Sequence, residues 1–152
     1  MKTKFKIFSL VIIFFLSSCG FKPIYSSKGQ NFTLGNVNLV GDKKLVKYFE
    51  TRIKRFKGES NKKYDLEVKL DVAKNIVSKD KKGDPSIFSI QVSLKMILKQ
   101  SNKPDTSKTF VQNTNYNNIT NKFDLKKHER NLEKQLIDKI IEDFIFYIQS
   151  IQ

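Results

Sequence analysis

Apolar and polar residues alternate along two stretches of the chain, residues 64–72 and residues 88–98. Alternation is the pattern of a strand that has one face in the core and the other in water. Residues 78–85, between the two stretches, are polar and contain glycine and proline, which favours a turn. The pattern therefore predicts a hairpin with an exposed, lysine-rich tip.

The period of the pattern is different upstream of this hairpin. Residues 32–40 have apolar side chains on both sides of Gly35-Asn36, which predicts a strand with a bulge. After residue 42, apolar side chains recur at spacings of three and four. This spacing indicates an amphipathic helix that ends at Gly58. Its apolar positions are Leu45, Val46, Phe49, Ile53 and Phe56.

Downstream of the hairpin, residues 102–105 predict a second turn and residues 106–118 a further strand. A long C-terminal helix follows, for which Asn121 is a suitable N-cap. Residues 144–148 are apolar all round, which favours burial between the sheet and the other helix over a partner surface. The apolar stripe of this helix contains Leu125, Leu132, Leu136, Ile140 and Phe144.

The order of elements is thus β-α-β-β-β-α, an α/β (α+β) arrangement. Because the clearest strands have one polar face, the helices should cover only one side of the sheet. We therefore expect a two-layer sandwich with two helices on one face of a four-stranded mixed sheet. The first two strands would run parallel and the hairpins antiparallel. Residues 31–152 are long enough for a single domain.

The first 18 residues have the pattern of a secretion signal. Lys2, Lys4 and Lys6 precede an apolar run over residues 7–16, and small residues follow. A membrane-spanning helix needs about 20 apolar residues, so this run is too short to be one. We interpret residues 1–18 as a signal peptide and exclude them from the fold.

The sequence Leu16-Ser17-Ser18-Cys19 resembles the lipobox of bacterial lipoproteins. The resemblance implies that signal peptidase recognises Leu16, Ser17 and Ser18 before the cysteine and Gly20 after it. The resemblance implies a diacylglyceryl thioether on Cys19, cleavage before it and acylation of the new amino terminus. Gly20, rather than aspartate, favours the outer membrane as the destination. The alternative is that Cys19 is an ordinary cysteine of the signal. Residues 19–30 would be a lipidated tether, and no other cofactor is expected.

The chain is strongly basic, with a formal net charge of +14. The signal holds three of the lysines, so the mature part carries +11. Such a charge favours negatively charged partners. Nucleic acid is set aside as a partner because an exported protein does not meet the genome.

Residues that could support catalysis are few. His128 is the only histidine and lies near the apolar stripe of the last helix, which favours a structural position. No serine lies in a nucleophile-elbow sequence. The acidic residues are spread among lysines, and Glu142-Asp143 fits a solvated helix face, so no metal site is expected. The pattern disfavours an envelope hydrolase.

The first seven residues of the predicted mature chain, Cys19-Gly20-Phe21-Lys22-Pro23-Ile24-Tyr25, carry a family resemblance. They resemble the C-G-F-x-P-L-Y opening of the lipopolysaccharide (LPS) assembly lipoproteins of the LptE type, with Ile24 in place of the usual leucine. The predicted element order over residues 32–150 also agrees with that family. The resemblance implies a non-enzymatic lipoprotein that assembles with the large β-barrel of the outer-membrane LPS translocon and plugs it.

The family also binds LPS, and the phosphates of its lipid A are anionic. Lys79, Lys81 and Lys82 in the predicted hairpin tip are our candidate LPS contacts, chosen for their charge and exposure. The alternative is that these lysines only keep a turn solvated. The rival function is an adaptor lipoprotein that anchors a basic domain to the outer membrane and docks other envelope proteins.

Overall fold

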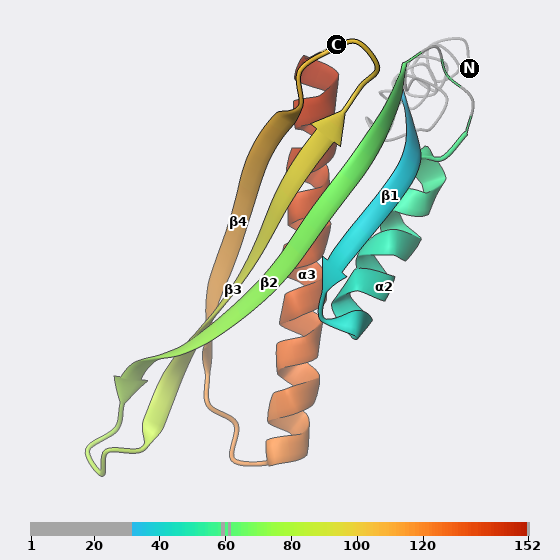
Figure 1. Ribbon diagram of the computed structural model, residues 1–152. Helices are drawn as coiled ribbons and strands as arrows, with labels where there is room; N and C mark the ends of the chain where they lie inside the picture. Colours follow the sequence, from blue (N-terminus) through green and yellow to red (C-terminus); the bar gives the residue numbers. More distant parts are fainter. Residues whose placement is uncertain (1–31, 59, 61, 152) are drawn as a thin grey trace, which may run out of the picture.

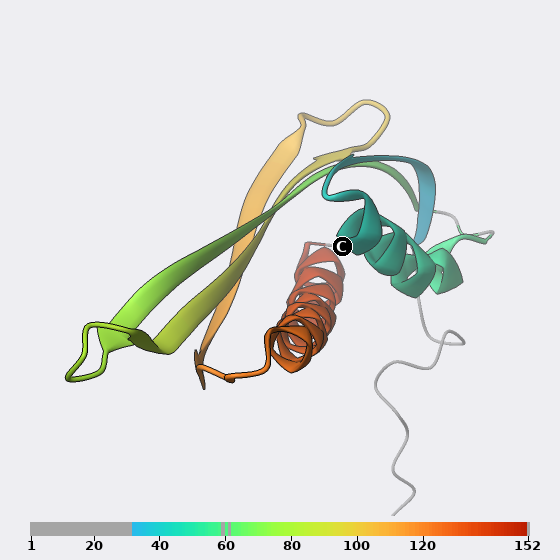
Figure 2. The ribbon, with the colours of Figure 1, turned by 90° about the horizontal axis from the view of Figure 1, so that it is seen from below.

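A computed structural model describes residues 32–58, 60 and 62–151. Within these residues, four strands form one sheet in the order β1-β2-β3-β4, and helices α2 and α3 lie on the same face of it (Figures 1 and 2). This confirms the predicted two-layer α+β fold and its element order. The elements are β1 (Thr33–Gly41), α2 (Lys43–Ile53), the short 3₁₀ helix η2 (Lys54–Phe56), β2 (Lys63–Lys79), β3 (Pro85–Lys99), β4 (Thr106–Asn117) and α3 (Lys122–Ser150).

The sheet is mixed, as predicted. β1 pairs with β2 in parallel, while β2 with β3 and β3 with β4 are antiparallel. The register of β1 shifts between Leu34 and Val37, where Gly35-Asn36 interrupts the apolar pattern. A Cβ on Gly35 would overlap the side chains of Lys63 and Asp65, which would have to move to make room for it.

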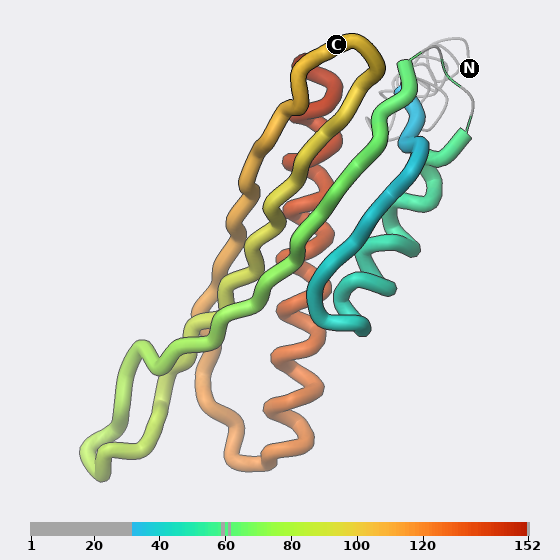
Figure 3. Tube along the Cα trace, in the orientation of Figure 1, coloured from blue at the N-terminus to red at the C-terminus, as the bar shows by residue number. Residues whose placement is uncertain are grey.

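The β2–β3 hairpin is longer than the alternating pattern predicts. β2 continues to Lys79, seven residues past the predicted end at residue 72, and the turn shortens to residues 80–84. Asp80 builds this turn, because its Oδ1 accepts from the backbone N–H groups of Lys82 (2.8 Å) and Asp84 (2.9 Å). Residues 75–89, here called the hairpin arm, lead away from α3 (Figure 3).

The core lies between the sheet and the helices. Helix α3 contacts β3, β4 and α2, so it needs a wider apolar face than one stripe. Its centre is Phe144, whose ring meets Phe49 of α2 and Phe110 of β4 edge-on at centroid distances of 6.5 and 6.4 Å. The buried residues of α3 are Leu125, Leu136, Ile137, Ile140, Ile141, Phe144, Ile145 and Ile148.

The apolar run over residues 144–148 is only partly buried. Phe144, Ile145 and Ile148 are buried as expected, but Phe146 is 73% exposed and Tyr147 is half-buried. The prediction of burial all round was therefore wrong for Phe146. The sheet and α2 leave one side of α3 open, and Phe146 lies on that side.

Candidate functional site

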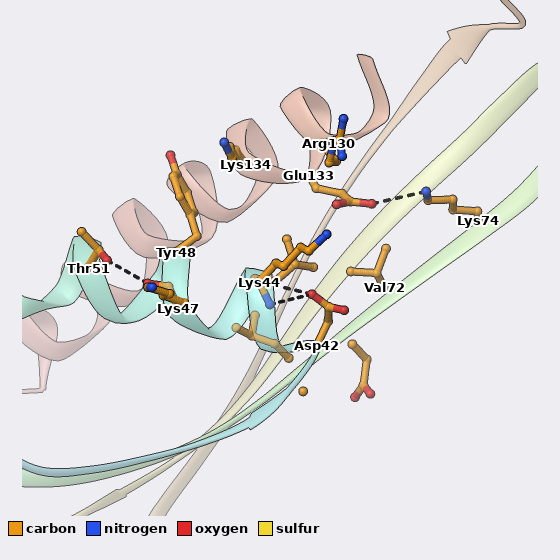
Figure 4. A pocket seen from close by; sticks show the side chains of 14 residues that line it. Asp42, Lys44, Lys47, Tyr48, Thr51, Val72, Lys74, Arg130, Glu133 and Lys134 are labelled. Carbon is orange, nitrogen blue, oxygen red and sulfur yellow. Dashed lines mark hydrogen bonds and ion pairs between the residues drawn. The ribbon is translucent and has the colours of Figure 1, made fainter. Parts of the chain in front are cut away.

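A groove of about 1150 Å³ lies where the end of β1, the middle of β2, α2 and α3 meet (Figure 4). It opens beside the start of α2, so the first turns of that helix form one wall and the middle of α3 forms the other. The lining residues are Gly41, Asp42, Lys44, Leu45, Lys47, Tyr48, Thr51, Leu70, Asp71, Val72, Lys74, Arg130, Glu133 and Lys134.

The turn before α2 sets the shape of the groove at the end of β1. Gly41 has a φ of +145°, and a Cβ there would overlap the backbone oxygen of Leu70. Only glycine therefore fits. Asp42 then caps α2, because its side chain accepts from the N–H groups of Lys44 and Leu45. The cap fixes the direction in which α2 leaves the sheet.

One polar cluster joins the root of the hairpin arm to α3. Lys74 of β2 donates to Glu129 at 2.8 Å and lies 3.3 Å from Glu133. The hydroxyl of Tyr116, on β4, donates to the other oxygen of Glu129 at 2.7 Å. The groove is thus closed on this side by contacts among β2, β4 and α3.

These contacts change the acidity of the groups in the cluster. Burial alone would raise the pKa of Glu129, but the hydrogen bonds from Lys74 and Tyr116 together lower it. The pKa of Tyr116 is raised, first by burial and then by its hydrogen bond to the Glu129 carboxylate. Burial would lower the pKa of Lys74, yet Glu129 and Glu133 raise it. The contacts therefore favour a charged Glu129, a charged Lys74 and a neutral Tyr116.

A second polar cluster joins α2 to α3. Tyr48 donates its hydroxyl hydrogen to Asp138 at 2.8 Å, and Arg52 donates to the Tyr48 oxygen at 2.7 Å. Arg52 also forms an ion pair with Asp138 at 3.1 Å. Burial is the main reason that the pKa of Tyr48 is raised. The two helical walls of the groove are therefore tied to each other as well as to the sheet.

The charges that line the groove are unbalanced, with five basic side chains against three acidic ones. Each acidic group is already engaged: Asp42 in the helix cap, Asp71 with Lys69 and Glu133 with Lys74. Among the described residues, none of four basic side chains in the lining forms an ion pair with a carboxylate. These are Lys44, Lys47, Arg130 and Lys134.

The floor of the groove is apolar. Leu45, Leu70 and Val72 contribute to it, and the stems of the surrounding lysines add aliphatic surface. The ammonium group of Lys134, on α3, lies 5.5 Å from the centre of the Tyr48 ring on α2. Figure 4 shows Lys44 reaching from α2 into the space in front of β2. The site offers cations above an apolar surface.

The candidate LPS contacts predicted from the sequence lie elsewhere, at the tip of the hairpin arm. Lys79, Lys81 and Lys82 are exposed there, and within the described chain they form no ion pair. None of these three lysines lines the groove. The nearest lysine of β2 that does so is Lys74, just before the hairpin arm begins. The predicted lipidation and signal-peptidase residues lie outside the described residues. These are Leu16, Ser17, Ser18, Cys19 and Gly20.

His128 has a structural position, as the sequence suggests. Its ring is half-buried and meets Tyr116 edge-on, with 5.8 Å between the ring centres. In residues 32–58, 60 and 62–151, no group of three or more histidine, cysteine, aspartate or glutamate residues could hold a metal ion. Over the same part of the chain, no helix is long and apolar enough to cross a membrane.

Sequence reasoning missed the groove. Its signal was present as two basic pairs, Lys44 with Lys47 at a spacing of three and Arg130 with Lys134 at a spacing of four. Each spacing places both members on one side of a helix. However, the two pairs are 83 or more residues apart in the chain, and only the packing of α2 against α3 brings them to one groove.

Comparison with known proteins finds a likeness of fold. No family profile and no curated protein sequence match the chain. A rare lipoprotein B from Shewanella oneidensis is similar, with 12% identity, a TM-score of 0.56 and coverage of 77% of this chain and 98% of that one. A minor lipoprotein from Acinetobacter baumannii has 10% identity and a TM-score of 0.59, covering 79% and 91%.

A third solved structure has the same fold, a lipoprotein B from Nitrosomonas europaea with 10% identity and a TM-score of 0.53. The likeness covers 77% of this chain and 84% of that one. At such identities the sequences have diverged, and what the proteins share is the fold. This chain therefore has the fold of these bacterial lipoproteins over nearly all of its described residues.

Proposed function

We propose that this chain is a non-enzymatic lipoprotein of the outer membrane, which assembles with the LPS-translocon β-barrel, plugs it and takes part in LPS insertion. One agreement carries the proposal: an N-terminus whose sequence predicts lipidation precedes a domain with the fold of known bacterial lipoproteins. The likeness reaches 98% of the Shewanella oneidensis chain, so it extends over that whole domain. The opening at Cys19–Tyr25, which resembles that of the LPS-assembly lipoproteins, was read from different residues and points the same way.

The partner is tested by purification. A tag after residue 152 would follow α3, and Ile151, the C-cap of that helix, is 38% exposed, so the tag should not disturb the core. Extraction from outer membranes in mild detergent, followed by mass spectrometry, should find a large LPS-translocon barrel in stoichiometric amount. Recovery of the protein alone, or with unrelated envelope proteins, would favour the anchored-adaptor function instead.

Cys19→Ala tests the anchor. Without the thiol no diacylglyceryl group can be attached, and stable anchoring needs more than one acyl chain. We expect the variant to lose most of its outer-membrane location and to keep the fold, because the described domain begins at Phe32. Fractionation of membranes and immunoblotting measure this, with Ser27→Ala in the predicted tether as the control. A Cys19→Ala protein that is still lipidated and outer-membrane bound would contradict the proposal.

The tip lysines are tested by replacing Lys79, Lys81 and Lys82 together with serine. Each exposed charge contributes at most about 1 kcal/mol to an ionic contact, so LPS affinity should fall several-fold. The unfolding midpoint in urea should change little, because these side chains form no ion pair within the described chain. Unchanged affinity in an LPS titration would remove these lysines as contacts and leave the solvated turn.

A further inference from the structure

We propose that the groove between α2, α3 and β2 is a binding site for a phosphorylated lipid, with a phosphate among its cations and an acyl chain on its apolar floor. This inference rests on the proposed function, in which that lipid is the lipid A part of LPS. It adds a site that the hairpin tip does not supply, because the tip offers charge without an apolar floor.

The charge of the groove selects an anion. Lys44 and Lys47 project from α2, Arg130 and Lys134 from α3, and within the described chain none of them has a carboxylate partner. Of the three carboxylates in the lining, Asp71 is ion-paired with Lys69 and Glu133 with Lys74, while Asp42 accepts from N–H groups at the start of α2. Among the described residues, four cations without an ion pair therefore face one carboxylate without an ion pair, and the balance is positive. Cations gathered around one opening attract a phosphate, and arginine can bind two of its oxygens at once.

The floor of the groove selects a lipid over a free anion. Val72 is half-buried, packs against the core and lines the groove together with the buried side chains of Leu45 and Leu70. An acyl chain placed there would remove further apolar surface from water, which is favourable by about 25 cal/mol per Å². A volume of about 1150 Å³ has room for such a chain together with a headgroup.

The groove is built before any ligand arrives. Lys74 with Glu129 and Glu133 fixes β2 to α3, and Tyr48 with Asp138 fixes α2 to α3. The groove therefore does not have to be opened against the core. Preorganised walls reduce the entropic cost of binding, which favours a ligand site over an accidental gap.

The test compares two variants with the same loss of charge. The groove variant carries Lys44→Gln, Lys47→Gln, Arg130→Gln and Lys134→Gln. The control variant replaces four exposed lysines of α3 that do not line the groove. They are Lys122→Gln, Lys126→Gln, Lys127→Gln and Lys139→Gln.

The full-length lipidated protein, purified in a non-ionic detergent, is titrated with fluorescent lipid A. Glutamine is a good helix former, so both variants should fold, which circular dichroism checks. We expect the groove variant to bind at least about ten-fold more weakly than the wild type. The control should stay within about two-fold, since non-specific attraction is all that it loses. If the quadruple groove variant does not fold, the double variant Lys44→Gln/Lys47→Gln should still weaken binding several-fold.

The remaining arms identify the ligand. Dephosphorylated lipid A should bind more weakly than lipid A, and inorganic phosphate should compete only at concentrations far above those of the lipid. Equal binding by both variants would overturn the groove as the site, while wild-type binding and recovery of the barrel would leave the proposed function standing. Full displacement by inorganic phosphate at the concentration of the lipid would overturn the lipid as its occupant.

Discussion

Phe144→Ala should lower the free energy of unfolding by about 3–5 kcal/mol, the range for removing a large aromatic side chain from a core. Phe144 is fully buried, and its ring contacts Phe49 and Phe110. The substitution thus leaves a cavity where α2, β4 and α3 meet. A domain of this size has a total stability of about 5–15 kcal/mol, so the variant should unfold at a much lower urea concentration.

The control is Phe146→Ala, two residues further along the same helix. Phe146 is 73% exposed, so its removal should change the free energy of unfolding by about 0.5 kcal/mol or less. Urea titrations followed by circular dichroism measure both variants. Equal losses from the two substitutions would mean that α3 packs with a different face towards the sheet.

Glu129→Gln should destabilise the protein by about 2 kcal/mol near neutral pH, because a hydrogen bond to a charged group contributes about 1.5–3 kcal/mol. The amide can still accept from Tyr116, but it loses the charge that holds Lys74 at 2.8 Å. The expected figure is at the low end of the range because the Lys74 side chain is 40% exposed and can be rehydrated. The root of the hairpin arm should loosen from α3.

The loss should depend on pH. The pKa of Glu129 is lower in the folded protein than its usual 4.5, so the folded state favours the carboxylate. Its contribution is therefore fully present above about pH 4.5 and is lost as the pH falls through the folded pKa. The difference in stability between wild type and Glu129→Gln should shrink between pH 6 and pH 3. A difference that stays constant over this range would show that the charge of Glu129 does not act on the fold. Glu142→Gln, an exposed change on the same helix, is the control.

The parts of the fold that were predictable are those in which one face of an element meets the core. Tyr64, Leu66, Val68 and Leu70 are buried and their neighbours are not, so period and burial agree along the first half of β2. The N-cap at Asn121 was equally readable, because its side chain accepts from the N–H groups of Phe123 and Asp124. In each case the sequence pattern and the physical cause are local.

The second half of β2 could not be predicted from its pattern. Residues 73–77 are all exposed, so burial selects neither face and the alternation stops. These residues remain a strand because they pair with β3, for example Asn75 with Ser89 and Ile76 with Phe88. Pairing with a partner strand leaves no trace in the hydrophobic pattern of a single segment.

The groove could not be predicted for a related reason. Lys44 and Arg130 are ordinary exposed cations when each helix is considered alone. Their common position depends on how α2 crosses α3, which is set by buried contacts such as that of Phe49 with Phe144. Tertiary packing therefore decides which solvated charges become neighbours.

The length of β2 determines where the tip lysines lie relative to the rest of the sheet. Its first residue, Lys63, pairs with Thr33 at the start of β1, and its last, Lys79, adjoins the turn over residues 80–84. At about 3.3 Å per step, the 17 residues of β2 cover at most about 53 Å along the strand. The number of residue pairs in the hairpin therefore sets how far the lysines lie from the end of the sheet at which β1 begins.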